Sequence, residues 1–356
     1  MSTGLLNVER VSAETVRAET VRAGRRTRFR HRVLLTVGIA AAVVVVFAVS
    51  LMIGQKFYGP GEVIRVVLGE VVPGASFTVG ELRLPRAVLG LLAGFGFGIA
   101  GVTFQSMLRN PLASPDIIGI SSGAGAAAVI GLVVLSLDAT TVSFLALGAA
   151  LLTAAVIYLL SNGRGFAGTR LILIGIGVAA MLDSVIAYVL SRAAAWDMQL
   201  AMRWLTGSLN GVSWSTVVPL AIACAVLVPL LLALGRNLGM LRLGDDAASA
   251  LGVRVPATRI LLILAAVGLL AFATAATGPI AFVAFMAGPI AARIVGPGAS
   301  LLVPAGLIGA LLVLVADLVG QFVFGTRYPV GVITGVLGAP YLIFLLISRN
   351  RSGGSL

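Results

Sequence analysis

The segment RLPRAVLGLLAGFGFGIAGVTFQSMLRNPLASPDIIGISSGAGAAA (residues 83–128) joins two long apolar runs through a short polar turn. A helix that crosses a bilayer needs about 20 predominantly apolar residues, and the run before the turn is long enough. The turn contains Asn110, Pro111 and Pro115. Proline ends a helix and fixes the backbone for the start of the next one. The segment therefore predicts two membrane-spanning helices joined by a rigid connection.

The rest of the chain repeats this pattern. Of its 356 residues, 59% are hydrophobic and 11% are charged, whereas soluble domains are about 45–50% apolar and about 25% charged. The apolar runs are continuous rather than alternating, which excludes a β-barrel. We expect an all-α polytopic membrane protein with about ten transmembrane helices. They are placed at residues 33–53, 86–107, 115–135, 142–161, 169–191, 216–235, 258–276, 280–295, 300–321 and 328–348.

The basic residues indicate how these helices are oriented. If the N-terminus is cytoplasmic, most of the 25 Lys and Arg residues fall in cytoplasmic segments, as the positive-inside rule requires. Both termini are then cytoplasmic. The expected organisation is a basic N-terminal tail (1–32), a transmembrane domain (33–348) with its longest internal cytoplasmic loop at 236–257, and a C-terminal tail (349–356). The repeat AETVRAETVRA (13–23) predicts an amphipathic or disordered tail.

Residue counts exclude several chemistries. The chain has one cysteine, Cys224, and one histidine, His31, which lies in the N-terminal tail. The G-x-S-x-G pattern at residues 119–123 therefore lacks an intramembrane histidine, and we interpret it as a chance match to a hydrolase motif. Lys56, the single lysine, belongs to no ATP-binding G-x-x-x-x-G-K-[ST] loop. We expect no directly bound cofactor, no metal site and no nucleic-acid partner.

Glycines inside the second span also fit a known pattern. Gly96, Gly98 and Gly101 match G-x-G-x-x-G, but no strand precedes them. Gly90, Gly94 and Gly98 are four residues apart, the spacing of small residues on a face where two membrane helices pack closely. The sequence therefore predicts close helix packing here rather than dinucleotide binding.

Several segments together resemble one family. Besides 83–128 they are WLTGSLNGVSW (204–214), LGDDAASALGV (243–253), TGPIAFVAFMAGPIAARIVG (277–296) and YPVGVITGVLGAPYLIFLL (328–346). This order resembles FecCD-type permeases, the membrane subunits of bacterial ABC importers for ferric siderophores, haem and cobalamin. The resemblance implies a type II ABC importer permease fold and is greatest to the ferric-siderophore branch. The span at 280–295 is short and contains Gly288-Pro289, so we expect a broken or tilted helix there.

The resemblance implies functional positions in three groups. Residues of the cytoplasmic gate would be Asn110, Leu112, Gly168 and Thr169. A short helix that docks on an ATP-binding subunit would present Asp245, Asp246, Ala250, Leu251 and Gly252. Arginines that meet a substrate-binding protein would be Arg83, Arg86 and Arg327. The last group is less like the family, because Gln321 and Arg327 stand where relatives often have Arg and Glu.

The resemblance also implies partners and a location. They are two copies of an ATP-binding subunit, a second permease chain, an extracytoplasmic siderophore-binding protein and a ferric siderophore. A heterodimer of permeases is favoured over a homodimer. ATP would act through the partner subunit, so the chain itself would not be an enzyme. The location would be the bacterial cytoplasmic membrane, with membrane lipid around the chain.

Three other functions remain as alternatives. Acidic residues inside membrane spans are functional candidates, and Asp183 and Asp317 lie in the fifth and ninth spans. A proton-coupled secondary transporter would use them as carriers, whereas in the importer hypothesis Asp183 lies on the translocation path. An intramembrane hydrolase using Ser121 or Ser122 is disfavoured by the missing histidine. Haem or cobalamin replaces the siderophore in a third alternative.

Overall fold

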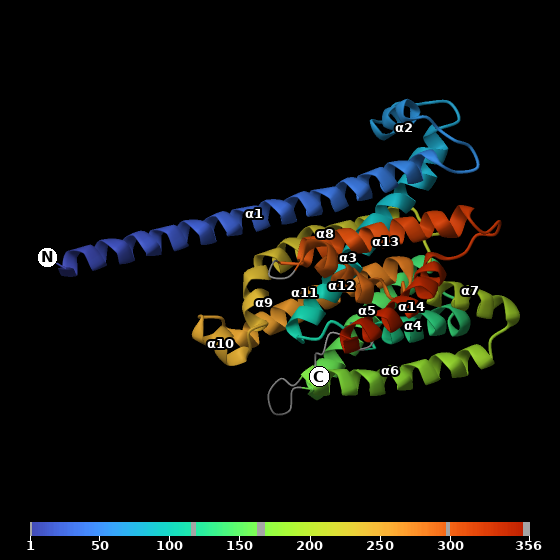
Figure 1. Cartoon of the computed structure of the whole chain (residues 1–356). Coiled ribbons are helices and arrows are strands. Elements are labelled where there is room, and N and C mark those ends of the chain that lie inside the picture. Colours follow the sequence, from blue (N-terminus) through green and yellow to red (C-terminus); the bar gives the residue numbers. More distant parts are fainter. Residues whose placement is uncertain (1, 115–118, 162–167, 297–299, 352–356) are drawn as a thin grey trace.

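The computed structural model describes residues 2–114, 119–161, 168–296 and 300–351, and this part of the chain is helical with no strand. Figure 1 shows a bundle of roughly aligned helices, with α1 along one side. The helices are α1 (Ser2–Met52), α2 (Pro60–Val67), α3 (Leu84–Met107), α4 (Ile120–Val129), α5 (Ala139–Ser161), α6 (Gly168–Ser191), α7 (Ala195–Leu205), α8 (Trp214–Ala233), α9 (Gly235–Leu241), α10 (Asp245–Ala250), α11 (Val255–Thr277), α12 (Val283–Val295), α13 (Leu302–Phe322) and α14 (Val330–Arg351). Two π-helical segments, η1 (Ser76–Arg83) and η3 (Ile130–Val134), precede α3 and extend α4.

The ten predicted spans are all present as helices. Eight helices in the described residues are long and apolar enough to cross a membrane, and two shorter apolar ones cover Ile120–Val134 and Val283–Val295. Residues 115–118, at the predicted start of the third span, lie outside the described residues. The remaining helices α2, α7, α9 and α10 are short connections. The all-α polytopic prediction is therefore confirmed.

The spans alternate in direction, so their connections gather at two ends of the bundle. In Figure 1, α10, the start of α1 and the end of α14 lie toward one end, and α2 and α7 lie toward the other. We call these the α10 end and the α7 end. The first helix extends from Ser2 to Met52 without a break at residue 32, and its N-terminal part projects beyond the bundle (Figure 1). The predicted tail is thus helical and continuous with the first span.

Helix α3 lies at the centre of the bundle and packs most extensively against α13. A Cβ atom at Gly94 would lie 2.7 Å from the Ala310 Cα, and one at Gly98 would collide with the Ala305 carbonyl. Gly309 on α13 approaches α3 in the same way. The glycines therefore let two backbones touch, as predicted from their spacing. This contact fixes the position of the turn that follows α3.

The helix break expected at Gly288-Pro289 is absent from the described residues: α12 is continuous through Pro289. The helical path is interrupted earlier, at residues 278–282. Gly278 and Phe282 both have positive φ, 71° and 64°. Gly278 is also held against another segment, since a Cβ there would collide with the Trp204 carbonyl. The span is short because the chain enters it through this non-helical segment.

Candidate functional site

The chain leaves α3 through a tight turn at the α10 end. Arg109 has a left-handed backbone (φ 53°). The Asn110 N–H donates to the Gln105 carbonyl at 3.0 Å, the bond that closes a helix C-terminus in a Schellman motif. The Asn110 side-chain oxygen accepts a hydrogen bond from the Leu112 N–H at 3.0 Å, which is an Asx turn. Local hydrogen bonds therefore make this connection rigid.

The four predicted gate residues lie in two separate elements. Asn110 and Leu112 are half-buried in the turn after α3. Gly168 and Thr169 begin α6, where Thr169 is exposed. In the parts of the chain that the structure describes, no hydrogen bond or ion pair joins the two pairs. Their role as a gate stays a prediction.

Helix α10 has the form predicted from LGDDAASALGV. It begins after Gly244 and ends at Ala250. Gly252 follows with φ 87°, and the Val253 N–H donates to the Ala248 carbonyl at 3.0 Å, which again closes a helix in a Schellman motif. Ala248 is fully buried and anchors the helix to the bundle. The outer surface is formed by Asp246, Ala250, Leu251 and Gly252, all exposed.

Asp245 differs from its neighbour because its carboxylate is turned toward the bundle. It accepts hydrogen bonds from one Arg259 nitrogen at 2.9 and 3.1 Å. The Arg259 side chain is only 9% exposed and lies in the first turns of α11. A nitrogen of Arg109 lies 3.9 Å from the same carboxylate. Asp245 thus links α10 both to α11 and to the turn after α3.

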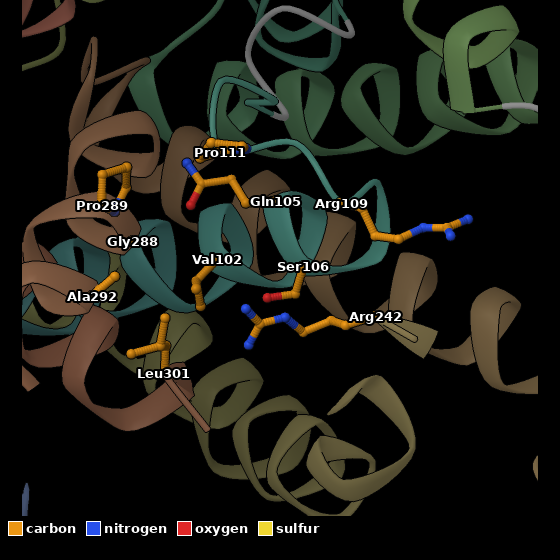
Figure 2. Close-up of a pocket in the computed structure, with 10 residues that line it drawn as sticks. All are labelled: Val102, Gln105, Ser106, Arg109, Pro111, Arg242, Gly288, Pro289, Ala292 and Leu301. Atoms are coloured by element: carbon orange, nitrogen blue, oxygen red, sulfur yellow. The ribbon is translucent and has the colours of Figure 1, made fainter. Parts of the chain in front are cut away.

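A cavity of about 360 Å³ lies beside this turn (Figure 2). It is lined by residues of α3, the turn itself, the segment between α9 and α10, α12, and Leu301 just before α13. In Figure 2 the Arg242 side chain reaches toward Ser106, whereas that of Arg109 points away from the cavity. The Gln105 amide donates to the Phe285 carbonyl at 3.0 Å. A side chain at Gly288 would collide with this amide, so α3 and α12 approach closely here. The cavity therefore lies between the turn after α3, the segment that leads into α10, and α12.

At the α7 end, Arg86 is engaged inside the bundle. It contacts both oxygens of Asp317, at 2.7 and 2.9 Å, and donates to the Asn210 side-chain oxygen at 2.7 Å. Gln321 donates to Asp317 at 2.8 Å from one helical turn later. The side chains of Arg86 and Asp317 are 18% and 7% exposed. This bidentate pair joins α3 to α13.

Arg83 also has an intramolecular role. Its guanidinium donates to the carbonyls of Leu51, Met52 and Lys56 at 2.6–2.9 Å. The last carbonyls of a helix have no intrahelical partner, so Arg83 satisfies those at the end of α1. Arg327, in contrast, is exposed in the segment between α13 and α14. Of the three arginines predicted to meet a partner, two are therefore occupied by contacts within this chain.

Asp183 is exposed on α6, a helix that is almost entirely uncovered in the single chain. It lies in the second half of α6, and none of the contacts described above involves it. Among the described residues, no group of three or more His, Cys, Asp or Glu side chains could hold a metal ion.

These features occur in a chain whose sequence matches the FecCD transport family over residues 42–348. The chain belongs to the FecCD transport family. The ferric enterobactin transport system permease protein FepG of Escherichia coli (strain K12) is 38% identical, over 90% of this chain and 98% of FepG. The achromobactin transport system permease protein CbrC of Dickeya dadantii (strain 3937) is 39% identical, over 92% of this chain and 96% of CbrC.

A solved structure supports the same assignment. It is described as an inward-facing conformation of a metal-chelate type ABC transporter and superposes with a TM-score of 0.79 at 25% identity. The superposition covers 88% of this chain and 98% of that one. This FecCD chain is therefore a multi-span membrane permease component of an ABC importer.

Two residues that organise the α10 end of this FecCD chain are not readily recognised as functional from the sequence. In the sequence Arg259 is one of many basic residues of the predicted cytoplasmic segments, but in the structure it is buried and binds Asp245. Gln105 was not singled out, although it bridges α3 and α12. One signal was available for Arg259: an arginine at the start of a long apolar run, VPATRILLIL, soon after a pair of aspartates. Gln105 gave no comparable signal.

Proposed function

We propose that the chain is the permease subunit of an ATP-driven importer that moves a ferric siderophore across the bacterial cytoplasmic membrane by alternating access. The observation that carries this proposal is the near-complete match to permeases named for ferric enterobactin and achromobactin, at 38% and 39% identity. ATP would be hydrolysed by a separate subunit, and the chain would bind no cofactor itself.

The assembly would contain two permease chains, two ATP-binding subunits and an extracytoplasmic siderophore-binding protein. The exposed surface of α10 supports contact with the ATP-binding subunit, since Asp246 is exposed and Leu251, just after the helix, is 57% exposed. The uncovered helix α6 provides surface for a second permease. We favour two different permease chains, as the family resemblance implies.

The α10 end would face the cytoplasm, and both termini with it. Arg109, Arg242, Arg254 and Arg259 lie at or next to this end, together with the arginines of the N-terminal part of α1. Cytoplasmic loops of membrane proteins carry an excess of Lys and Arg. Docking of the binding protein at the α7 end would then use exposed groups such as Arg327, since Arg83 and Arg86 already have partners.

Uptake of radiolabelled ferric catecholate siderophore by cells expressing the complete system tests the cargo. Labelled haem and cobalamin are the comparison substrates, and cells without the ATP-binding subunit are the control. ATP-dependent uptake of the ferric siderophore alone is the expected result. Uptake of haem or cobalamin instead would reject the siderophore. Uptake that continues without the ATP-binding subunit and stops with a protonophore would favour the proton-coupled alternative.

Asp183 would face the translocation path rather than lipid. A carboxylate inside a membrane span faces a bundle interior or a water-filled cavity, because its exposure to lipid is costly. Met181 is 71% exposed on the same helix and lies about 160° away from Asp183, given 3.6 residues per turn. It would face lipid.

Thiol labelling tests the environment of Asp183. The native Cys224 is buried and can be replaced in a Cys224→Ser background. In the assembled transporter we expect a membrane-impermeant maleimide to label Asp183→Cys and to leave Met181→Cys unlabelled. Equal labelling of both positions, or labelling of Met181→Cys alone, would contradict the assignment.

A further inference from the structure

A second cavity, of about 390 Å³, lies between α1 and the end of α12, apart from the site described above. Arg28, His31 and Arg32 line it from α1, and Gly296 lines it just after α12. Residues three and four apart lie on the same face of a helix, so these three side chains face one space. None of the described residues that line the cavity carries a carboxylate. It is therefore a basic site between two helices, and neither the family nor its relatives' names assign it a role.

The cavity lies where α1 changes from basic to apolar. Arg32 is followed by VLLTVGIAAAVVVV, the beginning of the apolar part of the first span. Leu34, three residues after His31, is 69% exposed, and Ile294 of the cavity lining is 41% exposed. Such a boundary is at the level of lipid headgroups, and the exposed apolar flank continues into the hydrocarbon region. A ligand with an anionic end and an apolar end fits both surfaces.

The chemistry of the lining indicates the anionic end. Arginine presents five N–H donors in a planar fork that matches phosphate oxygens. Arg28 uses its Nε to donate to the Gly24 carbonyl at 3.1 Å, which orients the guanidinium along the helix and leaves further donors. Basic clusters immediately cytoplasmic of a transmembrane helix attract anionic lipids. Arg293, in the last turn of α12, is directed elsewhere, since it donates to Ser348 and stacks on Phe344 of α14.

We propose that this cavity binds the phosphodiester headgroup of an anionic phospholipid, with the acyl chains against the exposed apolar side chains next to it, Leu34 and Ile294. The bound lipid would connect α1 to α12, which the protein itself joins by few contacts. This inference does not depend on which chelate the transporter carries.

Lipid retention by the purified full-length chain tests the proposal. Native mass spectrometry would compare phosphatidylglycerol with phosphatidylcholine of the same acyl chains. Arg28→Gln/Arg32→Gln removes the two arginines of the cavity. Arg26→Gln/Arg30→Gln removes the same charge from exposed residues on the opposite face of the same helix, and is the matched control. Arg28→Lys/Arg32→Lys keeps the charge but not the planar fork.

We expect the wild type to retain one phosphatidylglycerol in preference to phosphatidylcholine. The cavity pair should weaken this retention about tenfold or more, from the contribution of two arginines near the surface. The lysine pair should weaken lipid retention to an intermediate extent, and this partial retention would also show that the helix is intact. The control pair should weaken retention clearly less. If the cavity pair and the control pair reduce lipid retention equally, the lipid binds the basic surface of α1 in general, and the proposed site is overturned. Equal retention of phosphatidylcholine, or displacement of the lipid by inorganic phosphate, would overturn the anionic lipid as its ligand.

Discussion

Replacement of Asp245 by asparagine is expected to reduce siderophore uptake at least tenfold while the ATP-binding subunit remains bound. Asparagine keeps the size of the side chain but removes the charge that holds Arg259 and Arg109. Hydrogen bonds to charged groups contribute about 1.5–3 kcal/mol, and about 1.4 kcal/mol already corresponds to a factor of ten. Helix α10 would then move without moving α11 and the turn after α3. ATP hydrolysis and uptake measured on the same reconstituted complex would reveal the lost coupling.

Asp246→Asn is the matched control for this prediction. Asp246 is the next residue of the same helix, but its side chain is exposed, and the described residues give it no ion pair. Its substitution should weaken retention of the ATP-binding subunit, with uptake per assembled complex nearly unchanged. Arg259→Gln should behave like Asp245→Asn, since it removes the other half of the same pair. If Asp245→Asn instead releases the ATP-binding subunit, Asp245 belongs to the docking surface, as the sequence had indicated.

The fold could be predicted from the sequence because each span has a local signal. Continuous apolar runs define the helices, and the four-residue spacing of Gly90, Gly94 and Gly98 defines the face on which α3 packs against α13. The entry into α12 had no such signal. Phe282 adopts a positive φ, which aromatic residues rarely do, and Gly278 is held there by contact with a segment more than seventy positions earlier. A local pattern cannot reveal a turn that distant contacts impose.

The same limit applies to the functional residues. Asp245 and Asp246 are adjacent and chemically identical in the sequence, yet one faces Arg259 and the other faces outward. Arg83 and Arg86 were interpreted as docking residues because they precede a span on the outer side. Their partners, the end of α1 and Asp317, lie far away in the chain. Which charges are free for a partner protein is therefore decided by tertiary pairing, which the spacing of the residues does not contain.

Arg86→Leu is expected to destabilise the permease by about 3–5 kcal/mol, the cost of leaving one member of a buried ion pair without its partner. The Asp317 side chain is only 7% exposed, and among the described residues it would keep a single hydrogen-bond donor, Gln321. Thermal unfolding of the detergent-solubilised chain measures this effect. The double variant Arg86→Leu/Asp317→Leu should regain much of the loss, because an apolar pair of similar volume can replace a buried ion pair at little cost.

Arg327→Leu separates this structural role from docking. Arg327 is exposed between α13 and α14, so its loss should leave thermal unfolding unchanged. An exposed ion pair contributes only about 0–1 kcal/mol, and affinity for the siderophore-binding protein should fall by about fivefold at most. Arg86 and Arg327 would thus affect different measurements. Unchanged unfolding of Arg86→Leu, together with weaker binding of the siderophore-binding protein, would show that Arg86 reaches that protein and that its contact with Asp317 is dispensable for the fold.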